Sequence, residues 1–254
     1  MKNLFDVSGK IVLITGAGRG LGFAFATGFA DAGARVVIND VVAERAAQAS
    51  GSLRETGGSA VSYPFDVTNA EQVEDSVARI EQEVGPIDVL INNAGIHHRA
   101  PLAEMSLADW QAVIDVNLTG VFLVSRYVAK AMIERKRGVI INISSLNSEG
   151  ARPTIANYCA AKGGVTMLTK SMALEWGKYN IRANAIGPGY FVTDLTRSLV
   201  DNPDFDAWVK QSVPLARWGD PSELVGTAIF LASNASSYIS GRTIYVDGGW
   251  RAGL

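Results

Sequence analysis

Short apolar runs alternate with longer amphipathic stretches along almost the whole chain. Runs that are apolar at every position and rich in Val and Ile predict strands covered on both faces. We expect such strands at 10–16, 35–40, 60–66, 86–95, 138–144, 181–189 and 243–249. The stretches between them predict helices at 21–33, 42–58, 69–85, 107–135, 156–177 and 221–233. This alternation predicts an α/β fold: one doubly wound parallel sheet of about seven strands with helices on both faces.

One segment breaks the alternation. Residues 190–220 carry no clear strand or helix period, and we expect an irregular insertion beside the active-site edge of the sheet, where it can act as a lid. Elsewhere the sequence has no repeat, low-complexity tract or linker. We therefore expect a single domain over residues 1–254.

The composition gives no indication of a nucleic-acid-binding, membrane or secreted protein. The net charge of -2 gives no electrostatic reason to expect nucleic acid or a membrane surface as a partner. The only cysteine, Cys159, excludes an internal disulfide and fits a reducing compartment. The first ten residues lack the apolar core of a signal peptide, and no run approaches the length of an uninterrupted apolar membrane span. We expect a cytoplasmic protein.

A glycine-rich turn joins the first predicted strand to the first helix. In "TGAGRGLG" (15–22), Gly16 allows a sharp turn, while Gly20 and Gly22 remove side chains where the helix begins. Where glycines leave space at a helix N-terminus, the backbone N–H groups can bind a pyrophosphate. The spacing is G-x-x-x-G-x-G and differs from the commoner G-x-G-x-x-G. A tight turn without a ligand is the alternative, but the strand–turn–helix setting favours a dinucleotide.

Asp40 ends the second predicted strand, where an acidic group can accept hydrogen bonds from the ribose hydroxyls of the cofactor. A carboxylate there repels a 2′-phosphate by about 1 kcal/mol in water and about 4 kcal/mol at an effective dielectric of 20. Asp40 therefore favours NAD. Arg19 acts in the opposite sense because it can reach such a phosphate, so NADP stays open. A helix N-cap is the structural alternative for Asp40.

Tyr158 and Lys162 stand one helix turn apart in "YCAAK", so their side chains share one face of the predicted helix. A free tyrosine has a pKa of about 10 and is a poor base at neutral pH. One nearby cation lowers a pKa by about 1 to 3 pH units, so Lys162 and a positively charged nicotinamide can make the phenol an acid–base group. Ser145 follows the fifth strand at the edge where ligands bind. Asn117 is a polar residue inside an apolar helical stretch.

Taken together, these motifs resemble the short-chain dehydrogenase/reductase family over essentially the whole chain. The glycine turn, "NNAG" (92–95), Asn117, Ser145, "YCAAK" and "PG" (188–189) carry the resemblance. It implies a Rossmann sheet that binds NAD or NADP and a catalytic set of Asn117, Ser145, Tyr158 and Lys162. It also implies a homotetramer. The cofactor residues that it implies are Gly16, Gly18, Arg19, Gly20, Leu21, Gly22, Asp40, Asp66, Val67, Asn93, Ala94, Gly95, Tyr158, Lys162, Pro188, Gly189 and Thr193.

In that family the matching Tyr is the acid–base group, and the Lys binds the nicotinamide ribose and lowers the Tyr pKa. The Ser orients the substrate oxygen, and the Asn holds a water in a proton relay. An oxidoreductase that moves hydride between a nicotinamide and a secondary alcohol or ketone follows from the resemblance. An inactive member that keeps these residues for packing is the alternative.

The substrate is narrowed by longer stretches such as "ISSLNSEGARPTIANY" and "AIGPGYFVTDLT", which resemble gluconate 5-dehydrogenases and related sugar-acid or polyol dehydrogenases. Arg99 can pair with a substrate carboxylate, although a surface role is equally open. Arg152 is a further candidate for substrate hydroxyls. We expect His97 and His98 to be structural or pocket-lining, and we expect no metal site. The predicted substrate contacts are Arg99, Ser145, Asn147, Glu149 and Tyr190.

Two other functions stay open from the sequence. A 3-oxoacyl-thioester reductase fits the same glycine turn, but such reductases usually prefer NADP, against which Asp40 argues. A non-catalytic NAD-binding regulatory protein is the alternative from another class, and the intact catalytic set argues against it.

Overall fold

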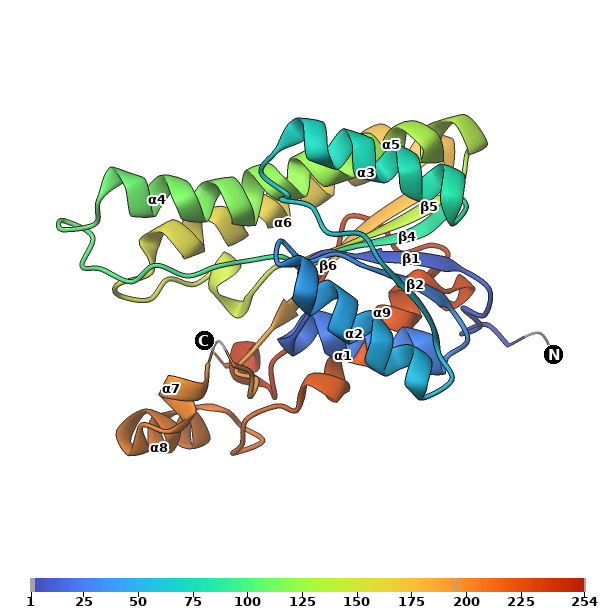
Figure 1. The fold of residues 1–254 in the computed structure, drawn as a ribbon. Coiled ribbons are helices and arrows are strands. Elements are labelled where there is room, and N and C mark those ends of the chain that lie inside the picture. Colours follow the sequence, from blue (N-terminus) through green and yellow to red (C-terminus); the bar gives the residue numbers. More distant parts are fainter. Residues whose placement is uncertain (1–2, 195, 254) are drawn as a thin grey trace.

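The computed structural model describes residues 3–194 and 196–253 (Figure 1). In this part of the chain, seven parallel strands form one sheet in the order β3-β2-β1-β4-β5-β6-β7. The order changes direction between β1 and β4, which makes the sheet doubly wound and confirms the predicted fold class. The strands are β1 (Ile11–Ile14), β2 (Arg35–Ile38), β3 (Ser59–Ser62), β4 (Ile87–Asn92), β5 (Gly138–Ile143), β6 (Ile181–Pro188) and β7 (Thr243–Val246).

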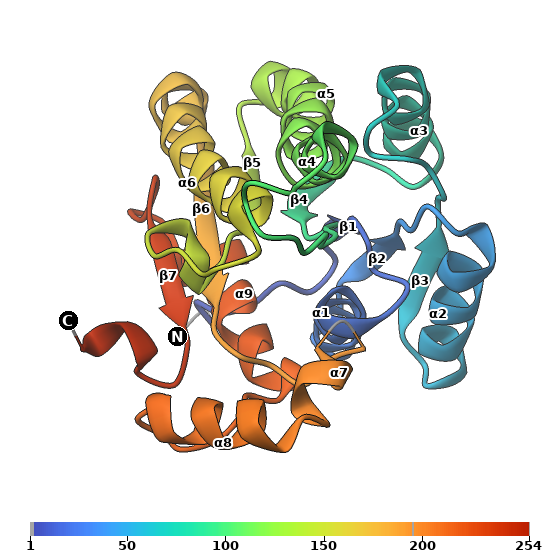
Figure 2. The same ribbon diagram turned by 90° about the vertical axis from the view of Figure 1, so that its left-hand side faces the viewer.

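Helices cover both faces of the sheet, as Figure 2 shows. On one face lie α1 (Gly20–Asp31), α2 (Ala43–Glu55) and α9 (Val225–Ala232). On the other lie α3 (Ala70–Glu83), α4 (Leu107–Ile114), α5 (Gly120–Arg135) and α6 (Ala156–Trp176). Short 3-10 turns span Leu146–Ser148, Gly177–Tyr179, Pro221–Leu224, Asn234–Ser236 and Trp250–Ala252.

β1 is apolar at every position because each face of the sheet has its own core. Along β1, Val12 and Ile14 pack with Phe25 of α1 on one face, whereas Leu13 packs with Met132 of α5 on the other. All five side chains are fully buried. Burial of each such side chain stabilises the fold by about 1.5–3 kcal/mol, which accounts for the missing polar alternation.

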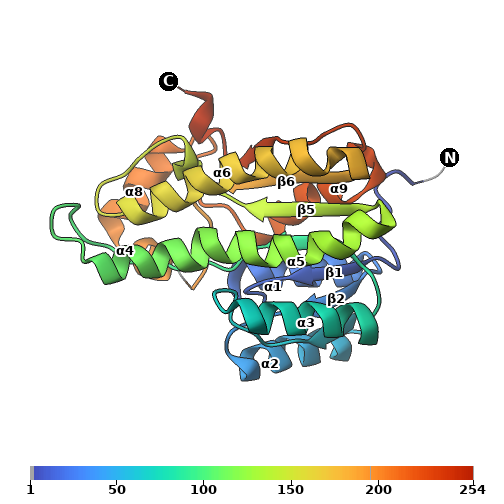
Figure 3. The ribbon, with the colours of Figure 1, turned by 90° about the horizontal axis from the view of Figure 1, so that it is seen from above.

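The predicted helix 107–135 is one long element with an interruption. In Figure 3, α4 and α5 run in line along one face of the sheet, and a π-helical turn at Asp115–Thr119 joins them. By length and composition this helix is apolar enough to cross a membrane, but half of its most apolar window is buried inside the fold. Its contacts with β4, β5 and α6 account for its apolar character.

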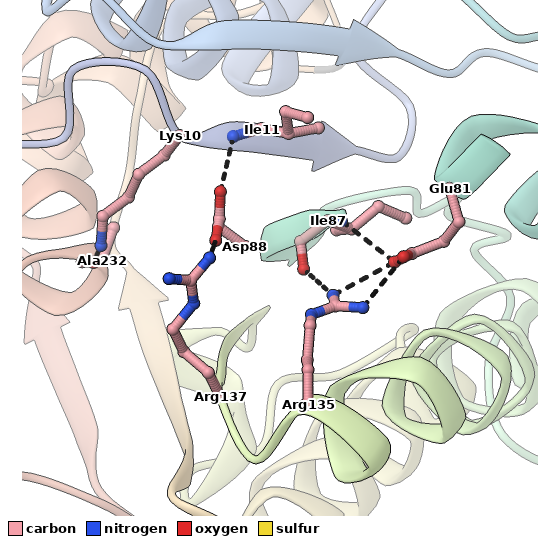
Figure 4. Close-up of polar contacts among 8 residues, drawn as sticks. All are labelled: Lys10, Ile11, Glu81, Ile87, Asp88, Arg135, Arg137 and Ala232. Carbon is pink, nitrogen blue, oxygen red and sulfur yellow. Dashed lines mark hydrogen bonds and ion pairs between the residues drawn. The ribbon is translucent and has the colours of Figure 1, made fainter. Parts of the chain in front are cut away.

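The amino ends of the strands are held by ion pairs (Figure 4). Asp88, at the start of β4, accepts a hydrogen bond from the Ile11 amide at 3.1 Å and pairs with Arg137 at 2.7 Å. Arg135 pairs with Glu81 of α3 at 2.9 Å. These contacts tie α3 and α5 to the sheet at the end opposite the predicted site, so we assign them to stability.

Residues 190–194 and 196–220, the described part of this segment, are more ordered than the sequence indicates. They contain the short helix α7 (Arg197–Val200) and the helix α8 (Pro203–Ser212), so the expectation of an irregular segment is wrong there. The Asn202 side chain caps α8 by accepting from the Phe205 amide at 3.0 Å, and Pro203 occupies the first turn. A small core of Val209, Val213 and Trp218 holds the segment together.

Candidate active site

A cavity of about 460 Å³ opens at the carboxyl ends of the strands, where doubly wound sheets bind their ligands. Its walls come from the glycine turn after β1, the loops after β2, β3, β4, β5 and β6, and α6. Most of the predicted cofactor residues line it: Gly16, Arg19, Gly20, Leu21, Asp40, Asp66, Val67, Asn93, Ala94, Gly95, Tyr158, Lys162, Pro188, Gly189 and Thr193.

The glycine turn leaves room for an anion. Gly16 has φ +61°, and a Cβ there would lie 2.8 Å from the Ala94 Cα. Gly20 has φ +57°, and its Cβ would meet only Thr193, at 3.9 Å. The N-cap residue of α1, Arg19, makes no side-chain cap hydrogen bond, and the first turn carries no acidic residue. Free amide groups at the start of a twelve-residue helix fit a pyrophosphate.

Gly18 and Gly22 are not among the described residues that line the cavity. A Cβ at Gly22 would lie 2.3 Å from the Gly16 carbonyl oxygen, and a Cβ at Gly18 would lie 2.6 Å from the Asp40 carboxylate. Both glycines therefore allow close packing behind the turn. The Asn93 side chain also fixes the turn, because its amide donates to the carbonyls of Thr15 at 2.9 Å and Gly16 at 3.0 Å.

Asp40 lines the end of the cavity formed by the glycine turn and the loop after β2, and it is 5% exposed. Its carboxylate accepts a hydrogen bond from the Val42 amide at 3.0 Å, so it also holds the start of α2. Arg45 lies 3.7 Å from the same carboxylate and lines the cavity with Arg19. The sequence analysis missed Arg45. Its position five residues after Asp40, in the first turn of the following helix, was the available signal.

The predicted catalytic hydroxyls and ammonium meet at the other end of the cavity. Ser145 follows β5, while Tyr158 and Lys162 project from α6. The Lys162 Nζ lies 5.6 Å from the Tyr158 ring centroid and donates to the Ile143 carbonyl at 2.7 Å. Burial lowers the pKa of Lys162 from 10.5 to about 8, so the ammonium is still protonated at neutral pH.

The protein without a cofactor does not lower the pKa of Tyr158. In the protein alone, burial raises the pKa of Tyr158, and a hydrogen bond with Ser145 opposes this only in part. Lys162 is not among the groups that shift this pKa in the protein alone, and its ammonium donates to the Ile143 carbonyl. The phenol is therefore protonated at neutral pH.

Asn117 is fully buried in the π-helical turn and does not line the cavity among the described residues. Its side-chain oxygen accepts from the Ile96 amide at 2.8 Å, and its nitrogen donates to the Ile96 carbonyl at 3.0 Å. A polar side chain on this helix is thus paired with the loop after β4. The π turn accommodates it, and such turns are frequent at functional sites.

Of the predicted substrate contacts, Arg99, Ser145, Asn147 and Tyr190 line the cavity. Glu149 is not among the described lining residues and instead pairs with Arg251 at 2.5 Å. Arg152 does line the cavity. Its guanidinium lies 4.1 Å from the Trp208 ring centroid and donates to the Tyr190 hydroxyl.

Comparisons with known proteins identify the family of the chain. A family model described as Enoyl-(Acyl carrier protein) reductase matches residues 16–251. The chain is 49% identical over 249 residues to the 5-keto-D-gluconate 5-reductase of Escherichia coli (strain K12), with 98% of each chain covered. It matches the crystal structure of a gluconate 5-dehydrogenase from Burkholderia cenocepacia J2315 in complex with NADP and tartrate. That match has a TM-score of 0.96 and 49% identity, and it covers 99% of this chain and 98% of that one.

A 3-oxoacyl-[acyl-carrier-protein] reductase from Synechocystis sp. is more distant, at 42% identity over 96% of this chain and 97% of that protein. The predicted resemblance to gluconate 5-dehydrogenases is therefore confirmed, and the oxoacyl reductases are the weaker match. The chain belongs to the short-chain dehydrogenase/reductase family, whose members are NAD(P)-dependent oxidoreductases that act on CH–OH groups.

Proposed function

We propose that this protein reduces a keto sugar acid such as 5-keto-D-gluconate with NADPH, and oxidises the corresponding hydroxy acid in the reverse direction. One observation carries the proposal: a protonated phenol stands beside a serine hydroxyl in a cavity whose wall also holds the guanidinium groups of Arg99 and Arg152. The first pair fits a ketone oxygen, and the guanidinium groups fit a carboxylate. The names of the similar proteins support the same substrate class.

In the proposed reaction, Tyr158 donates its proton to the ketone oxygen while Ser145 donates a hydrogen bond to the same atom, so charge that develops there is stabilised. The phenolate left behind is stabilised by the Lys162 ammonium, which is protonated below pH 8 or so. When bound, the nicotinamide supplies the hydride. The glycine turn, Asp66, Val67, Asn93, Gly95 and Thr193 would hold the cofactor.

For Asn117 we propose a positioning role. It fixes the Ile96 backbone at the cavity wall through two hydrogen bonds. The relay water that the family resemblance implies would then lie beside this fixed loop.

For the cofactor we propose NADP rather than the NAD expected from Asp40. The Asp40 carboxylate is partly neutralised by Arg45, and Arg19 adds a second positive charge at this end of the cavity. An arginine near the ribose is the usual partner of a 2′-phosphate. The Burkholderia relative was solved with NADP, which supports this choice.

Replacing Arg45 with alanine should therefore lower kcat/KM for NADPH by about tenfold and leave kcat/KM for NADH nearly unchanged, since only NADPH carries the phosphate that Arg45 would bind. Arg54→Ala is the matched control, because Arg54 is exposed on the same helix and is not among the described lining residues. Steady-state kinetics with both cofactors measures the effect. An equal loss with both cofactors would show that Arg45 acts only through α2.

Arg99 is proposed to bind the substrate carboxylate. Arg99→Ala should raise KM for 5-keto-D-gluconate by roughly 10- to 100-fold, because a charged hydrogen bond contributes about 1.5–3 kcal/mol. KM for an uncharged ketohexose should not change. Arg126→Ala, an exposed arginine of α5, is the control. Equal effects on the charged and uncharged substrates would rule out the carboxylate contact.

The function itself is tested with a panel of keto sugar acids, ketoses and 3-oxoacyl thioesters, each with NADPH and NADH. We expect 5-keto-D-gluconate with NADPH to give the highest kcat/KM. A preference for the thioesters would favour the oxoacyl reductase, and cofactor binding without turnover of any compound would favour the non-catalytic alternative.

We further propose a single-domain, cytoplasmic homotetramer in which residues 190–220 form the substrate loop. The contacts of Tyr190 and Trp208 with Arg152 at the cavity support the loop assignment. Exposed apolar side chains on the outer helices support association: Leu107 on α4, Phe122 on α5, and Met167 and Leu174 on α6.

A further inference from the structure

His97 stacks directly on the predicted catalytic tyrosine. The two ring centroids lie 3.8 Å apart with an interplanar angle of 27°, and His97 lines the cavity from the loop after β4. His97 has no role in the proposed reaction. Because its ring covers the Tyr158 ring, it lies within reach of the part of a substrate next to the reacting carbon.

The charge state of His97 limits what it can do. Burial, together with the positive charges of Arg99 and Lys162, lowers the pKa of His97 to about 4. The ring is therefore neutral at neutral pH and is too weak a base to replace Tyr158. A neutral imidazole has one N–H donor and one acceptor nitrogen, which is the same capacity as a hydroxyl group.

One nitrogen of His97 is unsatisfied in the protein. Nδ1 is buried and has no hydrogen-bond partner within residues 3–194 and 196–253. An unpaired buried polar atom destabilises a fold, and a phenylalanine would provide the same stack without that penalty. A histidine here is explained if its ring, turning within the stack, pairs with a polar group that arrives with the substrate.

We propose that His97 is a specificity-determining residue whose imidazole, held on the Tyr158 ring, hydrogen-bonds a substrate hydroxyl on a carbon adjacent to the one that is reduced. The inference rests on the proposed function, because it requires a hydroxylated ketone. It distinguishes polyhydroxy ketones from simple ketones, whereas Arg99 distinguishes acids from neutral sugars.

Two variants distinguish a hydrogen-bonding role of His97 from a role of its ring in stacking. His97→Phe keeps an aromatic stack and loses the hydrogen bond, so KM for 5-keto-D-gluconate should rise about tenfold with kcat within twofold of the parent. His97→Gln keeps a donor and an acceptor and loses the stack, so its KM should stay within threefold of the parent. A role in packing alone predicts the reverse order, with Phe harmless and Gln harmful, and that order would overturn the inference.

The matched ligand is 5-oxohexanoate, which has the carbon chain, ketone and carboxylate of 5-keto-D-gluconate but no hydroxyl groups. Measured as a substrate or as a competitive inhibitor, it should bind the parent and His97→Phe equally within twofold. A tenfold loss on both ligands would contradict the hydroxyl contact.

If the parent does not reduce 5-keto-D-gluconate at all, the proposed function fails and this inference fails with it. If the parent is active and both variants match it, only this inference fails. NADPH binding and thermal melting confirm that both variants are folded.

Discussion

Replacing Tyr158 with phenylalanine should lower kcat for 5-keto-D-gluconate reduction at least 100-fold while NADPH still binds. The ring and its stack on His97 remain, so the variant removes only the proton that the ketone oxygen needs. General acid catalysis typically contributes about 10²–10⁴-fold, which sets the expected size. Loss of reduced-nicotinamide absorbance measures turnover, and cofactor fluorescence measures binding.

Tyr127→Phe is the control for this prediction, because Tyr127 lies on α5 and is not among the described cavity-lining residues. Its activity should match the parent. Residual turnover of Tyr158→Phe above about 10⁻² of the parent would remove Tyr158 as the acid–base group.

Lys162→Met should strongly lower the rate of reduction and should leave the free energy of unfolding unchanged or slightly raise it. A nearby cation favours a phenolate by about 1 to 3 pH units, so loss of the ammonium should slow reduction by about 10- to 10³-fold. NADPH affinity should also fall. Lys170 is an exposed lysine of the same helix, and Lys170→Met should change neither the rate of reduction nor the affinity for NADPH.

Stability follows from the buried charge. Depression of the Lys162 pKa from 10.5 to about 8 corresponds to roughly 3 kcal/mol of destabilisation while the group is charged in both states. Methionine removes this destabilisation but also removes the hydrogen bond to the Ile143 carbonyl, at a cost of about 1–3 kcal/mol. At pH 7 the cofactor-free variant should thus be as stable as the parent, or more stable by up to about 2 kcal/mol.

The pH dependence has a definite sign. Between about pH 8 and 10.5 the unfolded chain binds the Lys162 proton and the folded protein does not, so the parent gains stability as pH rises through this window. Any advantage of Lys162→Met should shrink over the same range. Urea unfolding at several pH values checks it, and a variant less stable than the parent at pH 7 by more than about 1 kcal/mol would contradict the argument.

Most of the fold was predictable because it depends on local patterns. β1 is apolar at every position since Val12 and Leu13 face different cores, and each strand found in the structure overlaps a predicted one. Asn69 caps α3 as the sequence indicates, accepting from the Glu71 and Gln72 amides. α8 was missed although Asn202 and Pro203 form a recognisable start, because the stretch is short and lies outside the strand–helix rhythm.

What could not be predicted depends on contacts between distant residues. Glu149 was expected at the substrate, but it pairs with Arg251, 102 positions away. The Asn117 side chain in the π turn hydrogen-bonds the backbone of Ile96, 21 residues earlier. The hydrophobic period of a helix gives no sign of such a contact. The direction of the Tyr158 pKa depends on burial and on where the Lys162 ammonium points, and spacing in "YCAAK" fixes neither.

The most direct test of the central claim is a crystal structure of the protein with NADP and 5-keto-D-gluconate. We predict that the C5 ketone oxygen lies about 2.6–3.2 Å from the hydroxyls of both Ser145 and Tyr158, with the carboxylate directed at Arg99. A ketone oxygen turned away from Tyr158, or a sugar acid bound outside this cavity, would contradict the account.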